Sequence, residues 1–203
     1  MSNTKQRTTL SDEERETLVE LIHIGMGRAC ASINQMVLNK VKWKIPIIPR
    51  QEDIKSGILQ DKAKENLVMS SLNFSGDLTG HVDIMFSRES GTELTAILNE
   101  IEPKDVDPQT MVETLNEIAN ITVNSIVGTL SNLLQKKLDF KTPVFHDSTQ
   151  LATANATDPS IQENVVVIAE FTIANTQVEG SFQLVFAYDT MSEATKKIRE
   201  KAS

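Results

Sequence analysis

The residues whose side chains could best take part in a chemical reaction form one spaced pattern, which occurs twice, 97 residues apart. The first copy is Glu16, Glu20 and His23, followed by 22 residues and then Pro46. The second copy has the same spacing and consists of Glu113, Glu117, Asn120 and Pro143. A single Glu-x-x-Asn pair arises by chance. Two copies in register, each closed by a proline at the same distance, indicate a duplicated unit with a site on each half.

Each copy is predicted to extend into a polar stripe, because residues three and four positions apart share one face of a helix. The second stripe comprises Glu113, Glu117, Asn120, Asn124 and Ser131. The first comprises Glu16, Glu20, His23, Gly27 and Asn34. The alternative interpretation is the solvated face of an amphipathic helix. The spacing shared by both halves favours a functional site.

The two copies differ at the position held by His23 and Asn120. A carboxamide donates one hydrogen bond and accepts another, so it can hold a water molecule in a fixed orientation. The imidazole of His23 is stiffer and its two nitrogens point apart, which predicts a weak or inactive first site. A pH-dependent second site, or a docking role, remains the alternative for His23.

Helices must position both copies. Ser11 and Glu14 form a capping box, which predicts a helix from Asp12 to about Lys40 that ends before Pro46. Its apolar stripe is Leu18, Ile22, Gly25, Ala29, Ile33 and Met36. Asp107 followed by Pro108 predicts the start of a second helix that runs to about Lys137. Its stripe is Leu115, Ala119, Thr122, Ile126, Leu130 and Leu133.

The remaining segments repeat in the same order in both halves. Strands are predicted over 66–74, 81–86, 164–173 and 181–188, a helix after the Ser87 cap, and a last helix after the Asp189 cap. Residues 1–10 are predicted to be flexible, 50–64 irregular and 147–163 a polar loop. We therefore expect an α+β variant of the α/β class: one pseudo-twofold domain, residues 11–203, with a mostly antiparallel shared sheet and two long site-bearing helices. Its two repeats would be residues 11–102, the first half, and 107–201, the second half.

Composition excludes several classes of function. The net charge of −8, the pI of about 5.0 and the aromatic content of 4% argue against nucleic-acid binding and against a basic membrane-surface module. The single cysteine, Cys30, excludes an internal disulfide and a Cys-rich zinc site. No apolar run approaches the roughly 20 residues of a membrane span. These features favour a cytoplasmic protein without a metal site, a nucleic-acid partner or a membrane partner.

The spacing of Glu117, Asn120 and Pro143 resembles the signature of the chemotaxis phosphatases CheC, CheX and FliY. Glu20 and Pro46 match the signature in the first half, where His23 replaces the family asparagine. The stretch 24–27 is similar to the glycine-containing segment that follows the motif in the family. The resemblance covers about residues 11–200, and two copies in one chain are more similar to CheC than to CheX. Glu16 and Glu113 stand where the family more often has Asp or Ser.

The resemblance implies hydrolysis of the phosphoaspartate of a CheY-like response regulator. It implies that Asn120 orients the attacking water and that Glu117 docks the receiver lysine, with Glu20 and His23 as a second, degenerate site and Pro46 and Pro143 as structural residues. It implies no cofactor of the protein's own and Mg²⁺ on the receiver domain. CheD is a second partner implied by the family, and the internal duplication favours a monomer.

Two other interpretations remain open. A degraded double motif could leave a non-catalytic adaptor that binds a phosphorylated regulator, CheD or a flagellar-switch component. A structural dimerisation module would explain the duplication but not the polar stripe. The retention of Asn120 with Glu117 and Pro143 favours catalysis, whereas His23 favours the adaptor.

Overall fold

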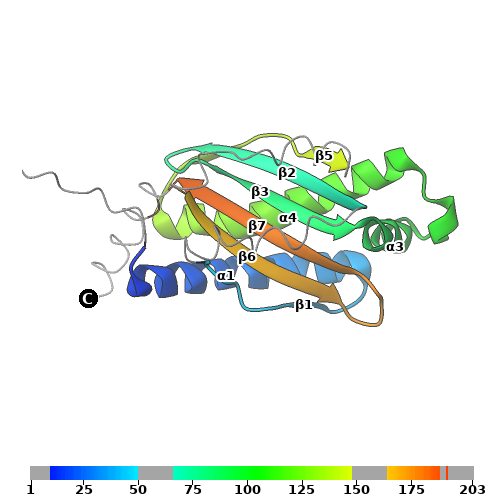
Figure 1. The fold of residues 1–203 in the computed structure, drawn as a ribbon, viewed down its shortest axis with the longest axis horizontal. Helices are drawn as coiled ribbons and strands as arrows, with labels where there is room; N and C mark the ends of the chain where they lie inside the picture. The colour runs from blue at the N-terminus through cyan, green and yellow to red at the C-terminus, as the bar shows by residue number, and fades with distance from the viewer. Residues whose placement is uncertain (1–9, 50–65, 148–163, 188–190, 192–203) are drawn as a thin grey trace, which may run out of the picture.

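The computed structural model describes residues 10–49, 66–147, 164–187 and 191. These ranges contain three α-helices and seven strands. The strands form one sheet, and the two long helices, α1 and α4, lie on one of its faces (Figure 1). Every strand pairing is antiparallel. The prediction of an α+β fold with a mostly antiparallel sheet and two long helices is therefore confirmed.

Helix α1, Asp12–Val37, begins at the predicted capping box. The Ser11 side chain accepts a hydrogen bond from the Glu14 backbone N–H at 3.1 Å, and the Glu14 carboxylate accepts one from the Ser11 backbone N–H at 2.7 Å. The helix ends where Leu38 adopts a left-handed conformation, with φ of 51°. Two orphan N–H groups at the helix start are thus satisfied by side chains.

Helix α4, Pro108–Leu134, begins at Asp107, whose carboxylate accepts hydrogen bonds from the backbone N–H groups of Gln109 and Thr110. Pro108 suits the first turn because its missing N–H needs no partner there. The helix ends at Gln135, which is left-handed with φ of 54°. The shorter helix α3, Arg88–Asn99, is capped by Ser87 as predicted and precedes the 3-10 turn η1, Pro103–Asp105.

The sheet has the strand order β1-β6-β7-β3-β2-β4, and β5 also pairs with β2. The two long hairpins are β2, Leu67–Gly76, with β3, Gly80–Ser87, and β6, Asn164–Ile173, with β7, Glu179–Ala187. Short edge strands follow the long helices: β1, Val41–Trp43, then β4, Leu138–Phe140, and β5, Val144–Asp147. The four predicted strands are all present, with ends that differ by at most two residues, and the predicted end at 188 lies outside the described residues.

The strand registers of the two halves correspond. Val41 pairs with Ile173, and the residues 97 positions away from them, Leu138 and Gly76, also pair. The edge strand of each half therefore pairs with the long hairpin of the other half. The central strands β3 and β7 join the halves, with Gly80 opposite Phe186 and, 100 residues from each, Gly180 opposite Phe86. Both halves contribute to one shared sheet.

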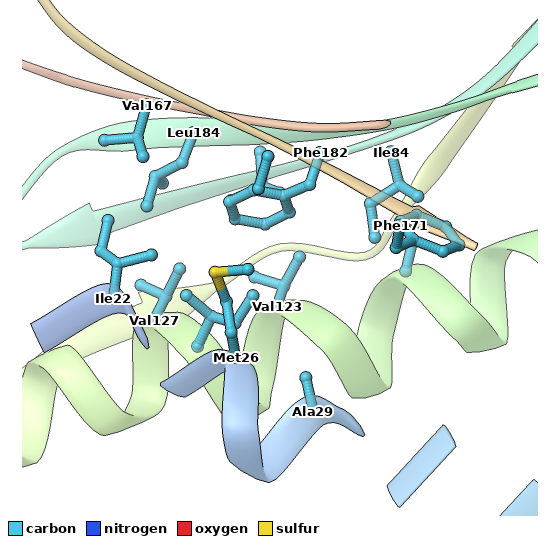
Figure 2. Close-up of a cluster of buried hydrophobic side chains, with 14 of the residues drawn as sticks. Ile22, Met26, Ala29, Ile84, Val123, Val127, Val167, Phe171, Phe182 and Leu184 are labelled. Atoms are coloured by element: carbon cyan, nitrogen blue, oxygen red, sulfur yellow. The ribbon is translucent and has the colours of Figure 1, made fainter. Parts of the chain in front are cut away.

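A single hydrophobic cluster fills the space between the helices and the sheet. Figure 2 shows Ile22, Met26 and Ala29 of α1 and Val123 and Val127 of α4 pointing toward Phe182 and Leu184 of β7. The two helices run in opposite directions, as the colours of Figure 1 show. They meet closely at Gly25, where a Cβ atom would lie 2.7 Å from Cα of Ile126. Burial against one core fixes which face each helix exposes.

Two residues of the predicted apolar stripes lie on the surface. Met36 is 36% exposed and Leu133 is 42% exposed, and these residues are 97 positions apart. The buried face continues instead through Val37 in α1 and through the partly buried Leu134 in α4. The helical period of 3.6 residues permits a step of three or of four, and both helices take four at this turn. Both helices also end three residues before the predicted ends, Lys40 and Lys137.

Several predicted segments lie wholly or largely outside the residues that the structure describes. The flexible segment 1–10 (except Leu10), the irregular segment 50–64 and the polar loop (except Asp147) lie outside the described residues. The last helix predicted after Asp189 lies outside them too, apart from Met191, which is helical and buried.

Candidate functional site

The second copy of the motif lies on the surface of α4. Glu113, Glu117, Asn120 and Asn124 are all exposed, whereas Ile118 and Ala119 beside them are buried. The buried face fixes the rotation of the helix, so the four polar side chains share the outer face at successive turns. The structure thus brings Glu117 and Asn120 together on one exposed surface. Within the described ranges, Glu117 has no ion-pair or hydrogen-bond partner from its side chain.

The side chain of Asn120 is held by Asn124, one turn further along the helix. Nδ2 of Asn124 donates to the backbone oxygen of Asn120 at 2.8 Å and to Oδ1 of Asn120, also at 2.8 Å. Within the described part of the chain, Nδ2 of Asn120 itself donates no hydrogen bond. The carboxamide therefore has a fixed oxygen and a free N–H group at the surface. The sequence placed both asparagines on one stripe, but did not reveal this contact.

The first copy lies on the matching surface of α1 with different chemistry. Glu16, Glu20 and His23 are exposed. The position equivalent to Asn124 is Gly27, also exposed, and a Cβ added there would meet no atom within 4 Å. Ile24, next to His23, is 48% exposed. This surface carries the two carboxylates but has no amide in either of the positions that correspond to Asn120 and Asn124.

The last residue of each predicted polar stripe serves the backbone instead of the surface. Oδ1 of Asn34 accepts a hydrogen bond from the backbone N–H of Val41 at 2.6 Å. The Ser131 hydroxyl donates to the backbone oxygen of Lys136 at 2.5 Å. Both side chains are half-buried and tie the helix end to the segment that follows. Asn34 and Ser131 therefore do not share the exposed surface of the other residues in their polar stripes.

The two motif prolines lie at bulges in the edge strands. Phe140 pairs with Phe74 and Val144 with Ser71, so four steps along the edge oppose three along β2. Pro143 lies within this bulge. The pairs that flank Pro46 are Trp43 with Phe171 and Ile47 with Ile168. A proline lacks a backbone N–H and is tolerated where the ladder is interrupted. Pro46 is buried and Pro143 half-buried.

The electrostatic features of the site are those of exposed carboxylates on two helix surfaces. Among the residues that the structure describes, no three His, Cys, Asp or Glu side chains are grouped so that they could hold a metal ion. None of the described helices combines the length and the apolar character of a membrane span.

Cys30 lies on α1, and burial raises the pKa of its thiol. Its Sγ atom lies 3.8 Å from the backbone oxygen of Val41.

Comparison with known proteins identifies the family. The model of the family described as chemotaxis phosphatase CheX matches residues 68–170, which is half of the chain. The chain belongs to the CheX family. The matched range runs from β2 to β6 and contains the motif with Glu117, Asn120 and Pro143. The predicted relationship to CheC, CheX and FliY is thereby confirmed at the level of the family, and the preference for CheC within it stays a prediction.

Several solved structures have the same fold. FliY from Thermotoga maritima has a TM-score of 0.69 at 16% identity, with 95% of this chain and 99% of that chain covered. The FliM middle domain from H. pylori has a TM-score of 0.64 at 11% identity, with 93% and 99% covered. A chain of the CheX-CheY-BeF3-Mg²⁺ complex from Borrelia burgdorferi has a TM-score of 0.58 at 18% identity, with 83% and 97% covered. At these identities the likeness concerns the fold.

Proposed function

We propose that this CheX-family protein hydrolyses the phosphoaspartate of a CheY-like receiver domain, with Asn120 as the residue that orients the attacking water. The observation that carries this proposal is the exposed Asn120 carboxamide, one turn after an exposed Glu117 on helix α4. The family assignment and the fold shared with a CheX that forms a complex with CheY support it.

The acyl phosphate of a receiver domain needs a water molecule that is positioned in line with phosphorus. Water attacks phosphorus in line with the bond to the aspartate oxygen, that bond breaks, and the products are aspartate and inorganic phosphate. The Asn120 oxygen accepts a hydrogen bond from the water while its N–H group donates to an oxygen of the reacting group. Positioning of this kind lowers the entropic part of the barrier. Mg²⁺ belongs to the receiver and contributes charge neutralisation there.

Glu117 would align the two proteins. Its carboxylate is exposed, lies on the face of Asn120 and is available for an ion pair with the receiver lysine. An ion pair at the edge of an interface adds register and specificity more than affinity. Replacement by glutamine should therefore raise KM by only about twofold to threefold and weaken discrimination between receivers, with Glu20→Gln as the matched change in the other half.

We further infer that the chain is a single domain that arose by internal duplication, with repeats at about 11–102 and 107–201. The shared 97-residue offset of motif, helices and edge-strand pairs supports this inference. The first half then retains the carboxylates of an ancestral site without its asparagine, and it contributes docking rather than turnover. CheD and a flagellar-switch component remain candidate partners for that docking surface, which would make this half an adaptor, and a monomer is the expected state.

The direct test is release of inorganic phosphate from a phosphorylated CheY-like receiver in the presence of Mg²⁺. Wild type should accelerate decay and Asn120→Ala should reduce the acceleration about 100-fold, as removal of a preorganised polar group does in other hydrolases. Asn132→Ala is the matched control, because it makes the same change at another exposed position of α4. Retention of full activity by Asn120→Ala would reject Asn120. No acceleration by wild type with several receivers would favour the adaptor, which pull-down with a BeF3-activated receiver would then detect.

A further inference from the structure

We infer that Asn124 is a positioning residue that presets the Asn120 carboxamide; this inference rests on the function proposed for Asn120. Asn124 lies four residues after Asn120, and its Nδ2 makes two hydrogen bonds of 2.8 Å, to the backbone oxygen and to Oδ1 of Asn120. The backbone bond anchors Asn124 itself. The second bond then fixes the terminal torsion of Asn120, which is otherwise broad and roughly twofold for an asparagine.

The contact also determines which atoms of Asn120 face outward. An amide oxygen has two lone pairs, and Asn124 uses one of them. The second lone pair of Oδ1 remains available, as does the Nδ2 group, which has no acceptor in the described part of the chain. A water molecule that arrives at this surface therefore meets an acceptor and a donor whose arrangement is already set. Preorganisation of this kind reduces the ordering cost of the reactive complex.

The first half lacks the same device. Gly27 occupies the equivalent position on α1, so an asparagine introduced at position 23 would have no amide four residues later to hold its carboxamide. The space beside Gly27 is open, because an added Cβ would meet no atom within 4 Å. The first half therefore differs from the second at two residues of this site, because His23 replaces Asn120 and Gly27 replaces Asn124.

A purely structural role for Asn124 makes a different prediction. Side-chain pairs at i and i+4 stabilise a helix slightly, so loss of such a pair would lower stability alone. Alanine is the better helix former, which offsets that loss. A positioning role affects kcat and leaves both thermal stability and KM for the receiver unchanged, because Asn124 need not touch the partner.

The first experiment measures kcat and KM of Asn124→Ala and Asn124→Asp on a phosphorylated receiver, together with their melting temperatures. The aspartate keeps the size of the side chain and removes the N–H donor. Both variants should lose about fivefold to tenfold in kcat with KM unchanged, the effect of one hydrogen bond. A kcat within twofold of wild type in both, or a rise in KM alone, would overturn the inference. If the Asn124 variants give one of these two results while Asn120→Ala is inactive, the proposed function of Asn120 still holds and only the role of Asn124 is rejected.

The second experiment rebuilds the contact in the first half. In the Asn120→Ala background, His23→Asn is combined with Gly27→Asn or, as matched control, with Gly27→Ala. Both combinations remove the glycine, but only the first supplies an amide four residues after position 23. Phosphate release should be about fivefold higher with Gly27→Asn than with Gly27→Ala. Equal rates in two active combinations would show that the amide neighbour has no effect, and two inactive combinations would show that it cannot complete this half.

Discussion

The two helix surfaces of this protein share a scaffold and differ in their polar groups. α1 and α4 are almost equal in length, are packed against one core and expose the same carboxylate positions. α4 adds Asn120 and the Asn124 that holds it, whereas α1 has His23 and Gly27. The scaffold therefore fixes where a site can lie, while two side chains determine whether the surface has a preset amide.

The largest effect is expected from exchanging the central residue between the halves. Asn120→His should lower phosphate release about 100-fold, because the imidazole cannot reproduce the amide's adjacent donor and acceptor. His23→Asn in the wild-type background should raise release by less than about twofold, because Gly27 leaves the new amide unrestrained. Steady-state kinetics of the two variants check both. A large gain from His23→Asn alone would mean that the halves differ by one residue only.

A smaller effect, on stability, is expected from two glycines of α1 that differ in their surroundings. Gly25→Ala places a Cβ 2.7 Å from Cα of Ile126, so the helices must separate, which should cost about 1–3 kcal/mol. Gly27→Ala enters open space and should stabilise the protein by about 0.5–1 kcal/mol. Urea unfolding measures both changes. Equal effects of the two substitutions would show that the crossing at Gly25 does not hold the two site surfaces together.

The smallest effect concerns the start of α4. Hydrogen bonds from Thr110, chiefly its hydroxyl, lower the pKa of Asp107 below its ordinary value of 3.8. Because the folded-state pKa is depressed, the stabilisation is complete above that ordinary value and is lost as pH falls through the folded pKa. Asp107→Ser keeps a cap without a charge, as Ser11 does for α1. Melting temperatures of wild type and variant should therefore differ near pH 6 and converge toward pH 2, and a constant difference would contradict the assignment.

Local signals in the sequence predicted most of the elements that position the site. The Ser11–Glu14 box and the Asp107–Pro108 pair set the starts of the long helices, and both are found. Helical spacing predicted buried positions correctly as far as Ile33 in α1 and Leu130 in α4. It failed at Met36 and Leu133, because a step of three and a step of four are both compatible with a helix and tertiary packing chose the second.

Contacts that depend on tertiary structure or on side-chain rotamers could not be read from the sequence. Asn34 and Ser131 fit the polar stripes by spacing, but each binds backbone beyond the end of its helix. The bulges at Pro46 and Pro143 depend on which strand lies opposite. The Asn120–Asn124 contact had a sequence signal, the i and i+4 spacing of two amides, whereas its choice of partner atoms did not.

The pairing of each edge strand with the opposite hairpin has a consequence for how the chain reaches its native state. β1 finds its partner β6 only after more than 120 residues of intervening chain, since Val41 pairs with Ile173. β4 must likewise return to β2 of the other half. Contacts between residues far apart in sequence slow folding, because the loop-closure entropy is lost before the contacts form. A newly synthesised first half therefore cannot complete its sheet alone. In its hairpin, β2 stays without its partner β4, and β3 without its partner β7, until the second half has been made.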